Sequence, residues 1–65
     1  MKIIVNGTAE ETAAPNLAAL LDALGYGGAR VATALNEEFV PAVTRGERQL
    51  AEGDRVEIVT PRQGG

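Results

Sequence analysis

The segment from residue 16 to residue 25 carries the clearest helical pattern in this chain. Its leucines recur at the i, i+3, i+4, i+7 spacing that forms one apolar stripe on a helix: Leu17, Leu20, Leu21 and Leu24. Asn16 can cap the start of the helix, because its side chain accepts a hydrogen bond from a free backbone N–H one turn later. Gly25 is suited to end it. A chain of 65 residues therefore has to build one core around one short helix, with the leucine stripe facing inward.

Short apolar and β-branched runs predict strands on either side of the helix. The Asn6-Gly7 pair predicts a tight hairpin turn, because both positions of such a turn need a positive φ. Asn36-Glu37 predicts a second hairpin, and Pro41 closes its return strand or places it at an edge. Residues 42–50 have little periodicity and predict irregular structure with room for a short helical turn. The predicted strands are residues 2–6, 8–12, 30–35, 39–40 and 55–60.

The predicted order, β-β-α-β-β-β, is an α+β arrangement in which one helix packs on one face of a small mixed sheet of about five strands. The first and last strands hold the densest β-branched residues, so we expect them to form the central pair and to run parallel. This is the order of the β-grasp, or ubiquitin-like, fold. We expect a β-grasp domain over residues 1–60 and a flexible C-terminal tail over residues 61–65. The side chains expected to face the helix are Ile3, Val5, Val56 and Ile58.

The residue types missing from the chain exclude most side-chain catalysis. Cys and His are absent, and so is Ser, which removes thiolate and Ser-His-Asp nucleophiles, the commonest general base and most transition-metal ligands. Six Lys and Arg residues against nine Asp and Glu residues give a formal net charge of −3. Because the basic residues are scattered, nucleic-acid binding is disfavoured. No apolar run is long enough to span a membrane, so we expect a cytoplasmic protein that is not an enzyme and binds no metal.

The tail is the remaining candidate for chemistry. From Pro61 it reaches at most about 17 Å, and nothing apolar follows to pack it on the domain. The α-carboxylate of Gly65 is ionised at neutral pH and can attack the α-phosphate of ATP to form an acyl-adenylate, which then accepts a sulfur or nitrogen nucleophile. Gly64 and Gly65 have no Cβ and can pass through a narrow slot of an activating enzyme. Arg62 and Gln63 would follow them toward that enzyme's active site.

In these features the chain resembles the ThiS-type sulfur carrier proteins of thiamine biosynthesis, a branch of the ThiS/MoaD superfamily. The resemblance covers the whole length, and its force comes from the order of the pieces. The matching segments are Ile3-Ile4-Val5-Asn6-Gly7, residues 17–25, residues 31–36, Val40-Pro41, residues 53–59 and Gly64-Gly65.

The resemblance implies a set of partners. A ThiF-like, E1-like adenylyltransferase would use ATP and magnesium to adenylate the Gly65 carboxylate. A sulfurtransferase pathway would convert the adenylate to a thiocarboxylate, and a ThiG-like thiazole synthase would take the sulfur into the thiazole ring of thiamine. The chain would bind no cofactor itself, because the ATP and magnesium belong to the adenylyltransferase.

Two departures and two alternatives accompany this interpretation. Members of the family often carry an Arg soon after Val-Pro and often a Trp a few residues later, whereas here Pro41 is followed by Ala42, the next Arg is Arg45 and Trp is absent. The sulfur could be destined for molybdopterin, tRNA thiolation or cysteine synthesis. Residues 50–60 also resemble the end of TGS domains, which would make the chain a plain binding module.

The open face of the predicted sheet is the candidate docking surface. If the alternation of β-branched residues is kept, Ile4 and Val59 point away from the helix. Exposed apolar residues on that face would suit docking on a partner enzyme, although single apolar side chains are also normal on a protein surface.

Overall fold

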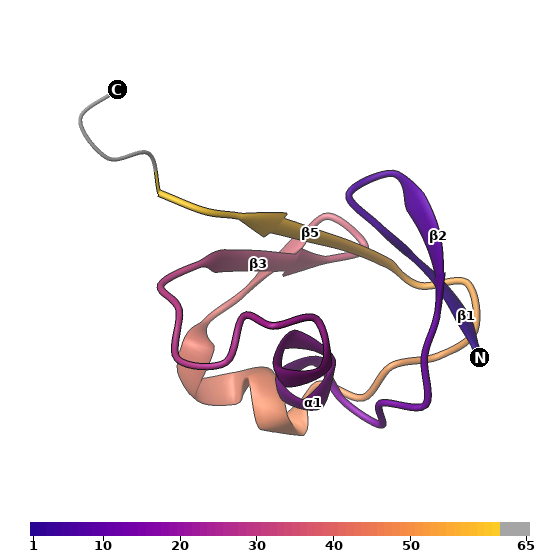
Figure 1. Cartoon of the computed structure of the whole chain (residues 1–65), viewed down its shortest axis with the longest axis horizontal. Coiled ribbons are helices and arrows are strands. Elements are labelled where there is room, and N and C mark those ends of the chain that lie inside the picture. The colour runs from indigo at the N-terminus through magenta and orange to yellow at the C-terminus, as the bar shows by residue number, and fades with distance from the viewer. Residues whose placement is uncertain (62–65) are drawn as a thin grey trace.

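A computed structural model describes residues 1–61 of the chain. Its sheet has the strand order β2-β1-β5-β3-β4, in which β1 and β5 are parallel neighbours and the other pairs are antiparallel. Helix α1 packs on one face of the sheet, and the 3-10 helix η1 lies on the same side (Figure 1). This is the predicted β-grasp arrangement, with the first and last strands at its centre. The elements are β1 (Lys2–Val5), β2 (Thr8–Glu11), α1 (Leu17–Ala23), β3 (Ala32–Leu35), β4 (Glu38–Val40), η1 (Ala42–Glu47) and β5 (Arg55–Val59).

Both predicted hairpins form, and both turn through left-handed backbone. Asn6 and Gly7 have φ values of 50° and 83°, and Asn36 and Glu37 have φ values of 50° and 72°. Asn and Gly adopt this region at low cost, whereas a side chain such as that of Glu37 does so at a cost of about 1–2 kcal/mol. The two turns therefore have the same form but different second residues.

Helix α1 begins and ends where its flanking residues predict. The Asn16 side chain accepts a hydrogen bond from the Ala19 N–H at 2.8 Å, and Gly25 follows the helix with a φ of 91°. Three of the four leucines in the stripe are buried, but Leu24 is 36% exposed. The prediction of a fully buried stripe is wrong for Leu24, because it is the C-cap residue of a helix that ends at Ala23.

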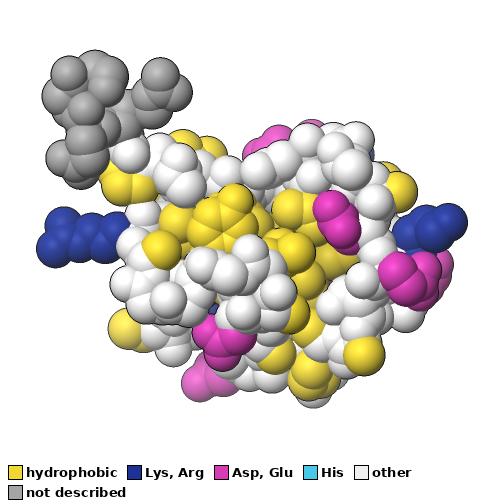
Figure 2. All heavy atoms as spheres, viewed as in Figure 1, with side chains coloured by type: hydrophobic (Ala, Val, Ile, Leu, Met, Phe, Trp, Pro, Cys, Tyr) yellow, Lys and Arg dark blue, Asp and Glu magenta, His cyan; other side chains and the backbone are white. Residues whose placement is uncertain are grey.

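The core lies between the sheet and α1, where hydrophobic side chains gather in Figure 2. Alternation along β1 and β5 sends every second residue into it, as the sequence predicts. Complete burial of aliphatic side chains of this size stabilises the folded state by about 1.5–3 kcal/mol each. The buried hydrophobic residues are Ile3, Val5, Ala14, Leu17, Leu20, Leu21, Leu35, Val40, Val56 and Ile58.

Four of the predicted strand boundaries move inward by one or two residues, β4 begins one residue earlier than predicted, and one segment is more regular than expected. The strand predicted over 30–35 begins at Ala32 because its last ladder partner is Val59, where β5 ends. The segment 42–50 contains the 3-10 helix η1, which buries none of its residues and so leaves no apolar periodicity to detect. The rest of the predicted tail, 62–65, lies outside the described residues.

Candidate functional site at the exit end of the sheet

Three strands share the end of the sheet at which β5 finishes. Because β3 runs antiparallel to both β5 and β4, β3 begins at this end and β4 finishes there. We call it the exit end, defined by Val59, Ala32 and Val40, and we call the opposite end, where β5 begins at Arg55, the entry end. Figure 1 shows the chain leaving β5 at the exit end, on the far side of the molecule from the N-terminus. Any group attached beyond Pro61 is therefore tied to the exit end.

The residues predicted to carry the chemistry come directly after Pro61 in the sequence. Gly65, Gly64, Gln63 and Arg62 lie outside the described residues. The residue that precedes them, Pro61, is exposed, and Val59 two residues earlier is 62% exposed.

The structure does not bring Ile4 and Val59 together as one patch. Both lie on the face of the sheet that α1 leaves open, since their strand neighbours Ile3 and Ile58 are buried. Ile4 is half-buried and aligns with Arg55 at the entry end. Val59 aligns with Ala32 at the exit end, four residues further along β5, which corresponds to about 13 Å.

An exposed aromatic residue on the open face was missed by the sequence analysis. Phe39 is 65% exposed and lies opposite Ala34 on β3. The signal was present, because Val40 must face the core and period-two alternation then turns Phe39 outward. The apolar surface on the open face thus extends from Val59 across β3 to the edge strand β4.

The side chain of Asn6 joins the first hairpin to β5, a second feature that the sequence analysis missed. Its Nδ2 donates to the Ile58 carbonyl at 3.2 Å, and its Oδ1 accepts from the Ile58 N–H at 2.8 Å. These two bonds continue the pairing of β1 with β5 after β1 has ended at Val5. They hold the last part of β5 in place just before the chain leaves the sheet.

Arg45 joins η1 to the start of β3. Its Nε donates to the Thr33 hydroxyl at 2.9 Å, and its Nη2 donates to the Val31 carbonyl at 2.6 Å. The Thr33 hydroxyl is buried and donates in turn to the Val40 carbonyl at 2.9 Å. The guanidinium of Arg45 is thereby held at the exit end.

The described part of the chain offers few groups for chemistry of its own. Within residues 1–61, no three acidic side chains are placed to hold a metal ion together. None of the helices described there is long and apolar enough to cross a membrane. On the face shown in Figure 2 the most prominent basic side chains project at opposite ends of the molecule.

The mixed five-strand sheet, covered on one face by helix α1, defines a small ubiquitin-like domain. Comparison with known proteins identifies the family within this class. The model of the ThiS family matches residues 3–65. The crystal structure of the thiamine biosynthesis protein ThiS from Geobacter metallireducens is similar, with a TM-score of 0.84 and 29% sequence identity over 100% of both chains. Among curated proteins, no sequence matches this chain.

The chain belongs to the ThiS family, because the family match covers nearly its whole length. Membership in this family and the likeness to a ThiS structure support a sulfur carrier role in thiamine biosynthesis.

Proposed function

We propose that this chain carries sulfur as a thiocarboxylate on Gly65 and delivers it for formation of the thiamine thiazole ring. The observation that carries the proposal is the family match, which extends through the diglycine to Gly65. The fold supports it, because β5 is the central strand of the sheet and leads out at Val59 toward those residues. A folded domain at one end and two glycines at the other suit a carrier that presents its carboxylate to separate enzymes.

The chemistry requires little of the carrier itself. The carboxylate oxygen of Gly65 attacks the α-phosphate of ATP, pyrophosphate leaves, and the resulting acyl-adenylate has AMP as its leaving group. Sulfur at the oxidation level of sulfide displaces AMP and gives the thiocarboxylate directly. A persulfide on a sulfurtransferase instead displaces AMP to give an acyl disulfide, which a second thiol then cleaves to the thiocarboxylate and a disulfide. Glycine at positions 64 and 65 lets the backbone enter a narrow active site without a side-chain clash.

The partners that we propose follow from these steps. A ThiF-like adenylyltransferase supplies ATP, magnesium and the adenylation site, and a sulfurtransferase supplies the sulfur. A ThiG-like thiazole synthase accepts the sulfur from the carrier. The side chains of Arg62 and Gln63 enter the active sites of these enzymes together with the glycines.

Intact-mass spectrometry tests the proposal. The protein is incubated with a ThiF-like enzyme, ATP, magnesium and a sulfur source, and the expected product shows one exchange of oxygen for sulfur, located at Gly65 by fragmentation. Addition of a ThiG-like synthase with its substrates should return the mass to that of the carboxylate. If an adenylyltransferase active on another carrier leaves the mass unchanged, the proposal is wrong for that class of partner.

Two variants separate the tail chemistry from the fold. Deletion of Gly65 should abolish the exchange and leave the unfolding transition unchanged. Lys2→Gln is the matched control, because it alters one exposed side chain at the entry end and keeps the whole tail, so it should still accept sulfur. Exchange in the deletion variant would place the reaction elsewhere on the chain.

A further inference from the structure

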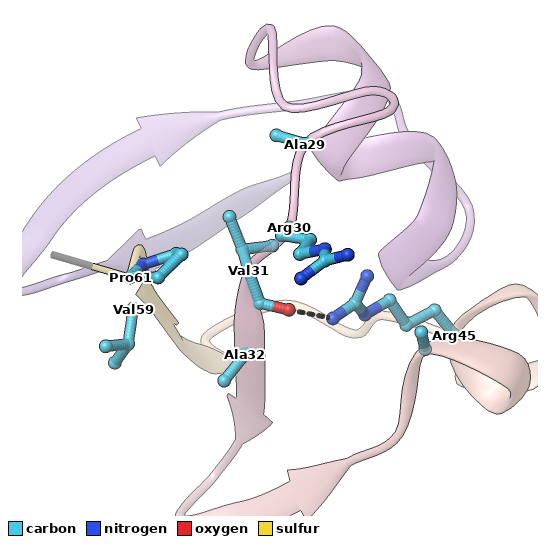
Figure 3. Close-up of a pocket in the computed structure, with 8 residues that line it drawn as sticks. Ala29, Arg30, Val31, Ala32, Arg45, Val59 and Pro61 are labelled. Atoms are coloured by element: carbon cyan, nitrogen blue, oxygen red, sulfur yellow. Dashed lines mark hydrogen bonds between the residues drawn. The ribbon is translucent and has the colours of Figure 1, made fainter. Parts of the chain in front are cut away.

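A groove of about 460 Å³ lies at the exit end, beside the point where the chain leaves the sheet. Most of its walls are aliphatic, and its charged members come from two segments that are far apart in sequence. Figure 3 shows that the guanidinium groups of Arg30 and Arg45 point toward one another there. The residues that matter for the following steps are Arg30, Val31, Arg45, Val59 and Pro61.

The positive charge of Arg45 is fixed in this groove. The side chain is half-buried, and two of its nitrogens are used by the Thr33 hydroxyl and the Val31 carbonyl. Both acceptors are neutral, so the hydrogen bonds orient the guanidinium without cancelling its charge. A charge held in one orientation by packing loses less conformational entropy when it binds a partner.

Arg30 brings a second positive charge to the same place. Its side chain is exposed, and across residues 1–61 no carboxylate forms an ion pair with Arg30 or Arg45. By contrast, Arg48 pairs with Glu38 at 3.1 Å, and Arg55 pairs with Glu37 at 3.7 Å. Two guanidinium groups that face each other repel, and this occurs on a chain whose net charge is −3. An anion from outside the described domain would relieve the repulsion.

The groove fits a protein carboxylate better than a nucleotide phosphate. A guanidinium forms paired hydrogen bonds with a carboxylate. Within residues 1–61 none of the Arg30 donors is used, whereas Arg45 beside it uses two of its nitrogens. A polyphosphate is normally bound by backbone N–H groups, lysine or a metal ion as well, and none of the described residues that line this groove is a lysine. The aliphatic surface of Val59 and Pro61 suits the apolar side chains that flank an acidic residue in a protein interface.

We propose that this groove binds an Asp or Glu side chain of the adenylating enzyme, with Arg30 forming the ion pair and Val59 and Pro61 contacting apolar residues beside it. The inference rests on the proposed function. The reach of about 17 Å from Pro61 to the end of the chain means that an enzyme that adenylates Gly65 must lie close to the exit end. The groove is then part of the contact that orients the carrier.

The test is a steady-state measurement of adenylation with wild-type protein and three variants. Arg30→Gln should raise the KM for the carrier about threefold to tenfold and leave kcat unchanged, since the loss of an interfacial charge weakens association rather than the chemical step. Arg30→Glu should raise KM more than tenfold, because like charges then face each other across the interface. Salt at about 0.5 M should reduce the difference between wild type and Arg30→Gln, since it screens exposed charge pairs.

Lys2→Gln is the matched control, because it removes one exposed positive charge at the other end of the molecule. Its KM should stay within about twofold of wild type, since a charge so far from the groove is screened by salt. Thermal unfolding of each variant shows that the changes in KM do not come from loss of fold.

Each result separates this inference from the function on which it rests. If wild-type protein is adenylated and Arg30→Glu has the KM of wild type, the groove proposal is overturned and the carrier function stands. If wild-type protein is not adenylated by a competent enzyme, both are overturned. Calorimetric titration of the carrier alone with ATP and with pyrophosphate tests whether the groove binds phosphate instead of a carboxylate. Binding to wild type that is lost in Arg30→Gln would show that the groove is a phosphate site and would overturn the carboxylate proposal.

Discussion

The two ends of β5 differ in whether their exposed side chains find partners among the described residues. At the entry end, charged and amide side chains bind within the chain: Asn36 Nδ2 donates to Asp54 Oδ1 at 3.1 Å, and Arg55 pairs with Glu37 at 3.7 Å. At the exit end, Arg30 has no carboxylate partner among the described residues, and Val59 is 62% exposed. The polar groups at the entry end are therefore used in contacts within the domain. The exit end leaves a positive charge and apolar surface exposed, where a partner can bind them.

This difference assigns separate roles to the two ends. Hydrogen bonds and ion pairs between two groups of the same chain contribute to the free energy of folding. Exposed groups without such a partner contribute to the free energy of binding, when another protein supplies the complementary group. Substitutions at the entry end should therefore change stability with little effect on the carrier reaction. Substitutions at the exit end should do the reverse.

The largest effect on stability should come from Asn36→Ala at the entry end. Asn36 has a φ of 50°, and its Oδ1 accepts a hydrogen bond from the Arg55 N–H at 2.9 Å. Alanine loses the side-chain hydrogen bonds and tolerates the left-handed backbone poorly, so the free energy of unfolding should fall by about 2–3 kcal/mol. Urea denaturation measures this change, and the KM for adenylation should stay at the wild-type value under conditions where the variant is folded.

Asn36→Gly is the control for this substitution. Glycine accepts the positive φ but makes no side-chain hydrogen bond, so its loss of stability should be smaller than that of Asn36→Ala by about 1 kcal/mol. Equal losses in the two variants would show that backbone strain plays no part. An altered KM in either folded variant would contradict the separation of the two ends.

A smaller effect, on partner binding, should come from Val59→Thr at the exit end. Threonine keeps the shape and the strand preference of valine, so stability should change by less than about 0.5 kcal/mol at this exposed position. Replacing one methyl group by a hydroxyl in a partner contact should cost about 1 kcal/mol, or roughly a fivefold rise in the KM for the carrier.

Ile4→Thr sharpens the same comparison, because Ile4 lies on the same open face but aligns with Arg55 at the entry end. Ile4 is half-buried, so this variant should lose more stability than Val59→Thr and should keep a KM near that of wild type. If Ile4→Thr raises KM as much as Val59→Thr does, the docking surface covers the whole open face and the two ends are not functionally distinct.

Local patterns explain why most of the fold could be predicted from the sequence. The leucine spacing, the Asn-Gly pair and the alternation around Ile3 and Val56 each report a structure formed by neighbours in the chain. The parallel pairing of β1 with β5 followed from one further step, since the two runs richest in β-branched residues belong at the centre of the sheet. The same reasoning placed Ile4 and Val59 on the open face.

The groove could not be predicted in this way. Arg45 is placed by hydrogen bonds to Thr33 and Val31, which are 12 and 14 residues away in sequence, and no periodic pattern reports such contacts. The helix that carries Arg45, η1, buries none of its residues, so it has no apolar stripe. Tertiary contacts alone bring Arg30 and Arg45 to the same groove.

The smallest effect should be a gain in stability from Glu37→Gly in the second hairpin. Glu37 has a φ of 72°, and relief of that conformation should contribute about 1–2 kcal/mol. Glycine gives back about 0.4–1 kcal/mol through the added freedom of the unfolded chain, and the exposed pair with Arg55 contributes little. The net gain in the free energy of unfolding should be about 0.5 kcal/mol, measured as a rise in the urea midpoint.

Glu37→Asn is the matched variant, because asparagine tolerates the left-handed region without the flexibility of glycine. If both variants are less stable than wild type, the ion pair with Arg55 contributes more to stability than the backbone strain at Glu37 costs. The stability of the entry end would then depend on its charges more than on its turn conformation.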